Sequence, residues 1–502
     1  MKEKLFLFLT CFVLYILIFP KINLFFLSFF FLIPFFIALK DVSFKKCLKF
    51  TFLFSFLSYN LLLYWIFPTL YNNEVNLVFA ILGVVSLSFY LSLYWVIYTI
   101  FLKIFWQSCL KKFFYFLFPA TLWVSLEFIR SHLFSGFPWF ILGSVFYKLP
   151  ILTQIASVTG VYGVSFLIVL VNTTLFEYIN KAKNKYIYIF TGIFIFTSVG
   201  YGYFSLRKEV APALNVVLIQ PNIPQHIKWN IRYKNVILNK LFSLTKKASW
   251  NNKDLLVWPE SVLPGYSVFE PTLISFIKRV SKQINIYQII GSNYKKDFNY
   301  YNSAFFISPK GNLLSHYDKI HLVLFGETIP LRVILSRFVN VVNEIGEISK
   351  GTQLTLFSHP KGKIAVVICF EAIFAHLVRR FVKRGADYLV NITNDAWFGK
   401  TSAPYQHFSL SVFRSIENRI SLIRVANTGI TAVVDPWGRI KKQTSIFTDD
   451  VVDEKIIKRI GPTFYSKYGD IFSYLCIAYS VILLLLKVGK VCRSKGCLKS
   501  LK

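Results

Sequence analysis

Three reactive side chains accompany short apolar runs in the second half of this chain of 502 residues. Glu260 ends the run DLLVWPE, Lys319 begins KIHLVLFGE, and Cys369 ends the run KIAVVIC. A carboxylate, an ammonium and a thiol are sufficient for acyl transfer. The carboxylate can accept the thiol proton and the thiolate can attack a carbonyl carbon. The ammonium can stabilise the oxyanion, together with a backbone N–H after the nucleophile.

Each of these residues also has an ordinary explanation. Cysteine often fills a core as a small hydrophobic residue, Glu260 and Lys319 could form an ion pair, and Glu327 could be a loop carboxylate. We favour a reactive site because three such groups at the ends of apolar strands in one domain are unexpected by chance. The sequence contains no GxSxG, HExxH, CxxC, GxGxxG or P-loop pattern, so it predicts neither a cofactor nor a metal.

The segment around these residues alternates between strand and helix patterns. Strands are expected at 214–220, 254–260, 287–292, 303–308, 363–371, 386–393 and 430–436, and helices at 231–249, 270–284, 373–384 and 405–421. SPKGN at 308–312 and DPWGR at 435–439 are typical of hairpin turns. This order predicts a mixed, layered α/β domain.

The chain as a whole has the composition of a membrane protein. Hydrophobic residues make up 55% of the chain and aromatic residues 18%, and the mean hydropathy is +0.52. The net charge of +33 does not by itself indicate nucleic-acid binding, because many lysines lie between apolar runs. We expect membrane spans at about 5–20, 22–39, 48–67, 77–102, 113–129, 161–178, 187–204 and 471–486.

The distribution of Lys and Arg predicts the orientation of these spans. With a cytoplasmic N-terminus, the cytoplasmic segments carry 18 of these residues and the three opposite loops carry three, Lys21, Arg130 and Lys148. Residues 206–469 then lie outside the cytoplasm. A cleaved signal peptide is the alternative for the first span, but no small-x-small cleavage site follows it. Cys369 would be the single cysteine of the outer domain.

The motifs VWPES, YDKIHLVLFGE and VVICFE resemble the Glu–Lys–Cys core of the nitrilase superfamily of carbon–nitrogen hydrolases. Together with the eight expected spans, they make the chain similar to the apolipoprotein N-acyltransferase family, which joins multiple spans to a periplasmic nitrilase-like domain. Further similar segments are FIRSHLFSGFPW (128–139), GVYGVSFL (160–167), QPNIPQHIKW (220–229), YNSA (301–304), NITNDAWFGKTSAPYQH (391–407), RSIENRISLIRVANTGITAVVDPWG (414–438) and YGDIF (468–472).

The resemblance implies a role for each reactive group. Glu260 would be the general base, Lys319 the oxyanion stabiliser, Cys369 the nucleophile and Glu327 a second acid that supports the base. The aromatic residues of SGFPW (135–139) and DAWFG (395–399) could line an apolar entrance or could simply anchor the protein at the interface.

Other residues of the site match the family or depart from it. Trp229, Asn302 and Glu371 match residues that the family uses around the site. Phe370 stands where the family usually has Tyr, which removes a hydroxyl and puts a substrate-positioning role in doubt. Leu324 replaces a usual Pro, so this loop lacks the restriction that a proline ring places on φ.

The sequence therefore predicts a multi-span α-helical membrane protein, with about eight transmembrane helices and an extracytoplasmic layered α/β domain. The resemblance implies that this domain is a nitrilase-like α/β sandwich of α-β-β-α layers. The expected domains are 1–205 (seven helices), 206–469 (periplasmic and catalytic) and 470–502 (last helix and basic cytoplasmic tail). The resemblance implies a multi-pass protein of the bacterial inner membrane.

The activity implied by the resemblance is N-acylation. A fatty acyl chain would pass from a glycerophospholipid, through a thioester on Cys369, to the α-amine of an S-diacylglyceryl-cysteine at a lipoprotein N-terminus. The partners would be a phospholipid donor, a diacylated apolipoprotein and the bilayer, without nucleic acid. A membrane-anchored amidase that releases an acid to water is the alternative enzyme. A transporter or a scaffold with a non-catalytic outer domain is the alternative from another class. The small number of ionisable residues in the spans disfavours the transporter, and loss of activity with a retained fold in Cys369→Ala would separate an enzyme from a scaffold.

Overall fold

The computed structural model describes residues 2–71, 75–109, 116–181, 185–228, 230–265, 269–324, 326–328 and 348–494. The chain divides into two compact units, which are described separately below. The helical unit comprises Met1–Leu206 and Tyr468–Lys502, and the α/β unit comprises Arg207–Lys467.

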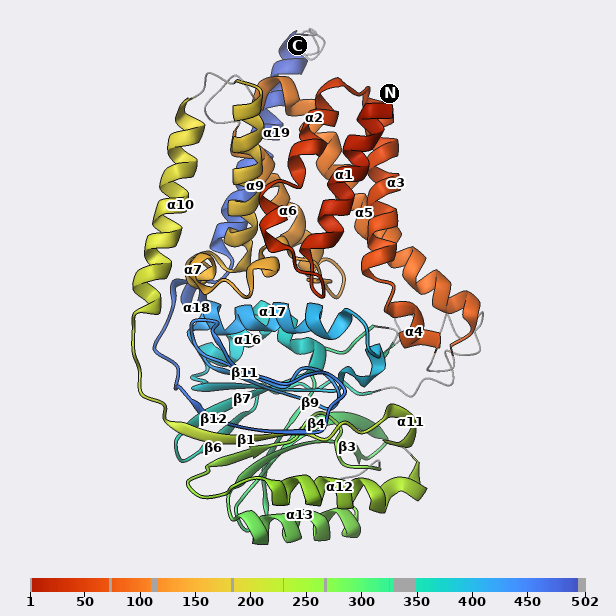
Figure 1. Cartoon of the computed structure of the whole chain (residues 1–502), viewed down its shortest axis with the longest axis vertical. Coiled ribbons are helices and arrows are strands. Elements are labelled where there is room, and N and C mark those ends of the chain that lie inside the picture. The colour runs from red at the N-terminus through yellow and green to blue at the C-terminus, as the bar shows by residue number, and fades with distance from the viewer. Residues whose placement is uncertain are drawn as a thin grey trace, which may run out of the picture. The chain divides into compact units, whose positions relative to one another are not determined.

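The helical unit is a bundle of apolar helices (Figure 1). Its principal helices are α1 (Lys2–Ile18), α2 (Leu32–Asp41), α3 (Phe44–Leu62), α5 (Leu77–Cys109), α6 (Phe118–His132), α9 (Val161–Ile179), α10 (Lys185–Leu206) and α19 (Ile471–Ser494). Shorter elements are η1 (Phe25–Phe29), α4 (Ile66–Tyr71), η3 (Leu142–Phe146), α7 (Pro150–Thr153) and α8 (Ala156–Thr159). Every expected span overlaps a described helix. Among the described residues, three helices are long and apolar enough to cross a membrane: residues 77–105 of α5, and all of α9 and α10.

The expected second span, 22–39, is wrong as one continuous helix. The structure places η1 and the ten-residue α2 there, with a break between them. Asn172 of α9 accounts for the break because it satisfies backbone groups on both sides. Its Oδ1 accepts from the Leu32 N–H at 2.9 Å, and its Nδ2 donates to the Ser28 carbonyl at 2.7 Å. Buried backbone N–H and C=O groups at a break in a helix lack helical partners and need other hydrogen-bond partners such as this side chain.

The expected fifth span also needs correction at its end. The helix α6 continues to His132, so Arg130 lies within it and is buried, rather than in a loop. The reason is that the loop folds back over the last turn of the helix. Arg130 Nη2 donates to the carbonyls of Trp139 at 2.9 Å and Phe140 at 3.1 Å, so the guanidinium replaces water for these two groups.

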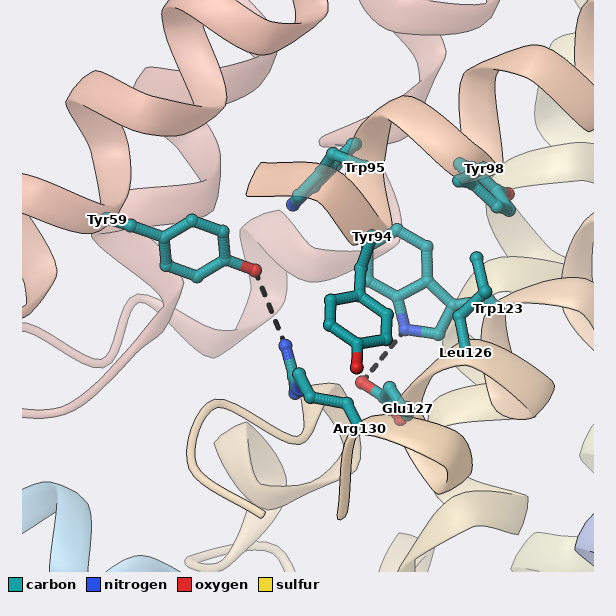
Figure 2. Close-up of a pocket in the computed structure, with 8 residues that line it drawn as sticks. All are labelled: Tyr59, Tyr94, Trp95, Tyr98, Trp123, Leu126, Glu127 and Arg130. Atoms are coloured by element: carbon teal, nitrogen blue, oxygen red, sulfur yellow. Dashed lines mark hydrogen bonds between the residues drawn. The ribbon is translucent and has the colours of Figure 1, made fainter. Parts of the chain in front are cut away.

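One turn earlier on the same face of α6, Glu127 also holds the backbone that follows this loop. Its Oε1 accepts from the backbone N–H of Leu142 at 2.7 Å and from Trp123 Nε1 at 2.9 Å. Figure 2 shows both charged side chains at an aromatic pocket of the helical unit. The pocket is lined by Tyr59, Tyr94, Trp95, Tyr98, Trp123, Leu126, Glu127 and Arg130.

The α/β unit contains two six-stranded sheets. One has the order β12-β1-β2-β3-β4-β5 and the other β11-β10-β9-β8-β7-β6. The strands are β1 (Leu214–Gln220), β2 (Leu255–Val257), β3 (Tyr287–Lys296), β4 (Asn299–Ile307), β5 (Leu313–Asp318), β6 (Leu356–His359), β7 (Gly362–Ile368), β8 (Tyr388–Thr393), β9 (Leu422–Ala426), β10 (Ala432–Val434), β11 (Ile440–Gln443) and β12 (Asp450–Ile456).

Helices cover the outer faces of the two sheets (Figure 1). One pair is α12 (Lys234–Lys247) and α13 (Pro271–Ile284), and the other is α16 (Ala375–Lys383) and α17 (Ala403–Asn418). The apolar face of α13 includes Leu273, Ile277 and Val280, which pack in one core with β-strand residues such as Val217 and Leu256. The α-β-β-α sandwich expected from the sequence is confirmed.

Five strands were not expected from the sequence: β5, β6, β9, β11 and β12. Four of them, β5, β6, β11 and β12, are the edge strands of the two sheets and contain polar residues. The central strand β9 was overlooked because its sequence LIRVA contains the buried Arg424, which interrupts an apolar run. The expected strand at 363–371 ends earlier, because β7 stops at Ile368 and Cys369 begins a 3-10 turn, η5 (Cys369–Ile373).

Candidate active site

The ends of three strands, β2, β5 and β7, carry the expected reactive groups. β1, β2 and β3 run parallel, and β5 runs in the same direction because two antiparallel steps separate it from β3. Glu260 and Lys319 therefore follow the carboxyl ends of strands of one sheet. Cys369 follows β7 of the other sheet, which is parallel to β8 and β9. The carboxyl ends of parallel strands are the usual location of sites in such sheets.

Glu260 is only 5% exposed, and both of its carboxylate oxygens accept hydrogen bonds. Oε1 accepts from Asn302 Nδ2 at 2.7 Å, and Oε2 accepts from the backbone N–H of Asn394 at 2.8 Å. Asn394 directly follows β8, so this second bond links the ends of the two sheets. The contacts hold the carboxylate in one orientation, as a general base requires.

Lys319 is almost fully buried, and its ammonium faces two carboxylates. Its Nζ lies 2.8 Å from Glu327 Oε1 and 3.6 Å from Glu260 Oε1. Burial opposes the charged form, but the two carboxylates more than offset burial and raise the pKa of Lys319 above its usual value. Lys319 therefore stays charged at any physiological pH, as an oxyanion stabiliser must.

Asn302 connects the two carboxylates on either side of the lysine. Its Nδ2 donates to Glu260 at 2.7 Å and also to Glu327 Oε1 at 3.2 Å. Glu327 in turn accepts from the backbone N–H of Val323 at 2.9 Å, which fixes the start of its own loop. The structure thus places the expected residues Glu260, Asn302, Lys319 and Glu327 in one hydrogen-bonded cluster.

Cys369 has an unusual backbone. Its φ is +52°, in the left-handed region, which costs a residue with a side chain about 1–2 kcal/mol. Burial raises the pKa of the thiol, the charge of Glu260 raises it further, and the charge of Lys319 lowers it. The thiol therefore keeps its proton in the free protein, and nucleophilic attack requires a base that accepts this proton during the reaction.

Glu371 braces the turn that carries the cysteine and is completely buried. Its Oε2 accepts from the N–H of Ile368 at 2.8 Å, just before Cys369. Its Oε1 accepts from the N–H groups of Ile320 at 2.7 Å and His321 at 2.9 Å, just after Lys319. Burial raises its pKa to about 7. The side chain of Glu371 thus connects the turn at Cys369 to the loop that follows Lys319.

Two other expected positions, Phe370 and Leu324, are described by the structure outside this cluster. Phe370 packs its ring against Phe374, with ring centres 5.2 Å apart. Leu324 is 37% exposed in the loop before Glu327. Trp229 lies outside the described residues.

Two residues of the site were missed by the sequence reasoning. Asn394 directly follows β8 and could have been found by the strand-end rule that identified Glu260. Lys228 in α11 (Gln225–Lys228) is 1% exposed, and its Nζ donates to the backbone carbonyl of Glu260 at 3.2 Å. Lys228 lies in QPNIPQHIKW, a segment similar to the family, but this similarity assigned it no role. Burial lowers its pKa to about 8, although Glu260 and Cys369 act in the opposite direction.

The chain matches the models of two protein families. Residues 216–463 match the carbon-nitrogen hydrolase family, and residues 13–174 match the apolipoprotein N-acyltransferase N-terminal domain. The two matches cover most of the α/β unit and most of the helical unit, respectively.

Curated relatives match over most of their length. An apolipoprotein N-acyltransferase of Geobacter metallireducens is 41% identical over 374 residues, which is 72% of each chain. One from Wigglesworthia glossinidia brevipalpis is 32% identical over 440 residues, 83% of this chain and 85% of the relative. One from Rickettsia prowazekii is 30% identical over 470 residues, 89% of this chain and 91% of the relative.

Proposed function

Because the chain belongs to the apolipoprotein N-acyltransferase family and is an acyltransferase of lipoprotein N-acylation, we propose that Cys369 carries the acyl group between the two substrates. The donor is a glycerophospholipid. The acceptor is the α-amine of the S-diacylglyceryl-cysteine at the N-terminus of an apolipoprotein. The acyl group is bound as a thioester between the two half-reactions.

In the first half-reaction, Glu260 accepts the proton of the Cys369 thiol while sulfur attacks the ester carbonyl carbon. Lys319 and a backbone N–H that follows the cysteine stabilise the oxyanion. The C–O bond then breaks, and Glu260 returns the proton to the departing oxygen of the lysophospholipid. In the second half-reaction the amine attacks the thioester, Glu260 accepts its proton, and the thiol leaves with that proton.

One observation supports these roles above all. Lys319 lies 3.6 Å from the Glu260 carboxylate, which Asn302 and Asn394 hold, and Glu371 bonds both the residue before Cys369 and the residue after Lys319. Glu327 pairs with Lys319 at 2.8 Å, which leaves the more distant Glu260 available as the base.

The hydrolase alternative is not favoured. The N-terminal part of the chain matches the N-terminal domain model of the acyltransferase family. The relatives reported above are named acyltransferases, and their similarity extends over 72% and 83% of this chain.

The proposal extends to location and domain roles. The chain is a membrane protein, and we place it in the bacterial inner membrane with eight spans, in residues 1–205 and 470–502. The catalytic domain, residues 206–469, lies in the periplasm. The excess of Lys and Arg in the other segments supports this placement.

The decisive experiment separates the two half-reactions. Purified full-length protein is incubated with labelled phospholipid without an acceptor, and Cys369 is examined for a hydroxylamine-sensitive acyl mass. A diacylglyceryl-cysteine peptide is then added. Accumulation of the thioester and its discharge by the peptide are expected. Cys369→Ala should give no adduct, whereas Cys476→Ala in the helical unit should behave like the wild type.

Two results would contradict the proposal. Rapid release of free fatty acid without the peptide would indicate a hydrolase. The absence of any adduct in an active preparation would reject the covalent role of Cys369.

A further inference from the structure

The backbone carbonyl of the proposed nucleophile is held by two side chains from other elements. His407 of α17 has its Nε2 3.2 Å from the Cys369 carbonyl oxygen. Asn391 of β8 donates from Nδ2 to the same oxygen at 3.3 Å and to the Val367 carbonyl at 3.1 Å. A carbonyl with two such donors cannot turn freely, so these contacts favour the left-handed conformation of Cys369.

A buried ion pair orients both of these donors. Arg424 Nη1 donates to Asn391 Oδ1, which leaves the Asn391 amide nitrogen facing Val367 and Cys369. Arg424 Nη2 donates to Asp395 Oδ2 at 2.9 Å and lies 3.1 Å from His407 Nδ1. All four of these side chains are at most 1% exposed.

His407 faces the Cys369 carbonyl with Nε2 and the ion pair with Nδ1, which lies 3.1 Å from both Asp395 Oδ1 and Arg424 Nη2. A bond to the Cys369 carbonyl requires a hydrogen on Nε2. Burial and the charge of Arg424 lower the pKa of His407, whereas Asp395 raises it. Burial opposes the charge of Asp395, but Arg424 and His407 more than offset it and lower its pKa to about 2. Asp395 therefore stays ionised and keeps Arg424 in place.

The packing leaves little room for another arrangement. A Cβ at Gly429 would lie 2.1 Å from Asp395 Oδ2, so only glycine allows the carboxylate to occupy this position. Thr393 donates to Asp395 Oδ1 at 3.1 Å and restrains its other oxygen.

We propose that His407 is a positioning residue for thioester formation. The Arg424–Asp395 pair orients His407. Together with Asn391, His407 holds the Cys369 backbone so that the thiol points at the substrate carbonyl. His407 contacts no substrate in this role. The inference rests on the proposed function of Cys369 as the nucleophile.

The test uses the full-length protein and compares His407→Leu, which removes the Nε2 donor, with His407→Gln, whose amide can still donate. The first readout is the rate at which iodoacetamide alkylates Cys369, followed by mass spectrometry of the peptide that contains it. This rate needs no enzymatic activity. The second readout is thioester formation from labelled phospholipid at several concentrations, which separates kcat from KM.

We expect both rates to fall in His407→Leu with KM unchanged, and the loss can reach about 100-fold if the thiol moves by about 1 Å. His407→Gln should recover most of both rates. His359→Gln, in a buried histidine of β6 that contacts the Asp254 carbonyl, is the matched control and should behave like the wild type.

Wild-type rates in His407→Leu would overturn the inference, as would an equal loss in the Leu and Gln variants. If His407→Leu does not fold, His407→Asn replaces it, because its amide is one methylene shorter than that of Gln. A slow Asn variant beside a fast Gln variant supports the inference, and equal rates overturn it. Full activity of Cys369→Ala would instead reject the proposed function, while the alkylation comparison would still be informative.

Discussion

Two buried lysines of the α/β unit show how neighbours determine the charge of the same side chain. Lys319 lies 2.8 Å from one carboxylate and 3.6 Å from another, and its pKa is raised. Lys228 donates to a backbone carbonyl, and burial lowers its pKa to about 8. Lys319 is thus a permanent cation, whereas Lys228 loses its charge in a range that an assay can reach.

We predict that this difference appears in the pH dependence of thioester formation. Lys228 is charged below pH 8 and neutral above it, and its charge favours the developing thiolate of Cys369. The rate should therefore fall above about pH 8, by about tenfold per pH unit if only the charged form is active. Lys228→Arg should remove this alkaline decline, because Arg remains charged. Single-turnover acylation between pH 6 and 10 measures the effect, and an identical decline in both proteins would refute it.

Phe370 provides a second prediction at this scale. Its ring packs against Phe374, and a hydroxyl at this position would leave the backbone of Cys369 unchanged. Phe370→Tyr should therefore preserve thioester formation. It should change transfer to the amine by up to about tenfold, as expected for one hydrogen bond worth ~0.5–1.5 kcal/mol. Separate assays of the two half-reactions would decide, and a large change in thioester formation alone would contradict the prediction.

Among the elements, α6 carries the least expected feature of the helical unit. Glu127 and Arg130 lie on one face of the helix and hold the backbone of the following loop at Trp139, Phe140 and Leu142. The two charges are thus used for backbone groups that a hydrophobic side chain could not satisfy.

We predict that Arg130→Met loosens this loop. Methionine is unbranched like arginine but leaves the carbonyls of Trp139 and Phe140 without their donor. Each lost bond to a charged group is worth about 1.5–3 kcal/mol, so amides of residues 137–142 should exchange hydrogen faster. His132→Gln, in the same helix, is the control, because the His132 ring contacts the carbonyl of Phe128 in its own helix. Unchanged exchange in Arg130→Met would show that packing alone holds the loop.

For the whole molecule, the central question is on which side of the membrane the α/β unit lies. Arg130 lies in the last turn of α6, and many of the 18 Lys and Arg residues on the other side also lie at helix ends, so the count of 18 against three is kept. This asymmetry predicts the side of the α/β unit.

We therefore predict that the α/β unit faces the periplasm and that both termini face the cytoplasm. A reporter that is active only outside the cytoplasm should be active when it is fused after residue 300, and inactive after Lys502. Residue 300 is suitable because it follows the β3–β4 turn, where Phe298 is 94% exposed. Activity of the reporter at Lys502 but not at residue 300 would reverse the topology.

The sequence by itself determined the apolar helices, the layered α/β domain and the strand-end positions of Glu260, Lys319 and Cys369. These features depend on local patterns, namely the length and periodicity of apolar runs and the residues that follow them. Family motifs added Asn302, Glu327 and Glu371, and the structure brings these residues to the same strand ends.

Tertiary structure alone decided the features that depend on residues distant in sequence. Asn172 breaks the second span from 140 positions away, and Arg424 orients His407 and Asn391 from a strand whose pattern was overlooked. The burial of Lys228 beside the Glu260 carbonyl is likewise a result of the fold. A buried polar group is stabilised by whichever partner the fold brings to it, and the sequence near that group does not specify the partner.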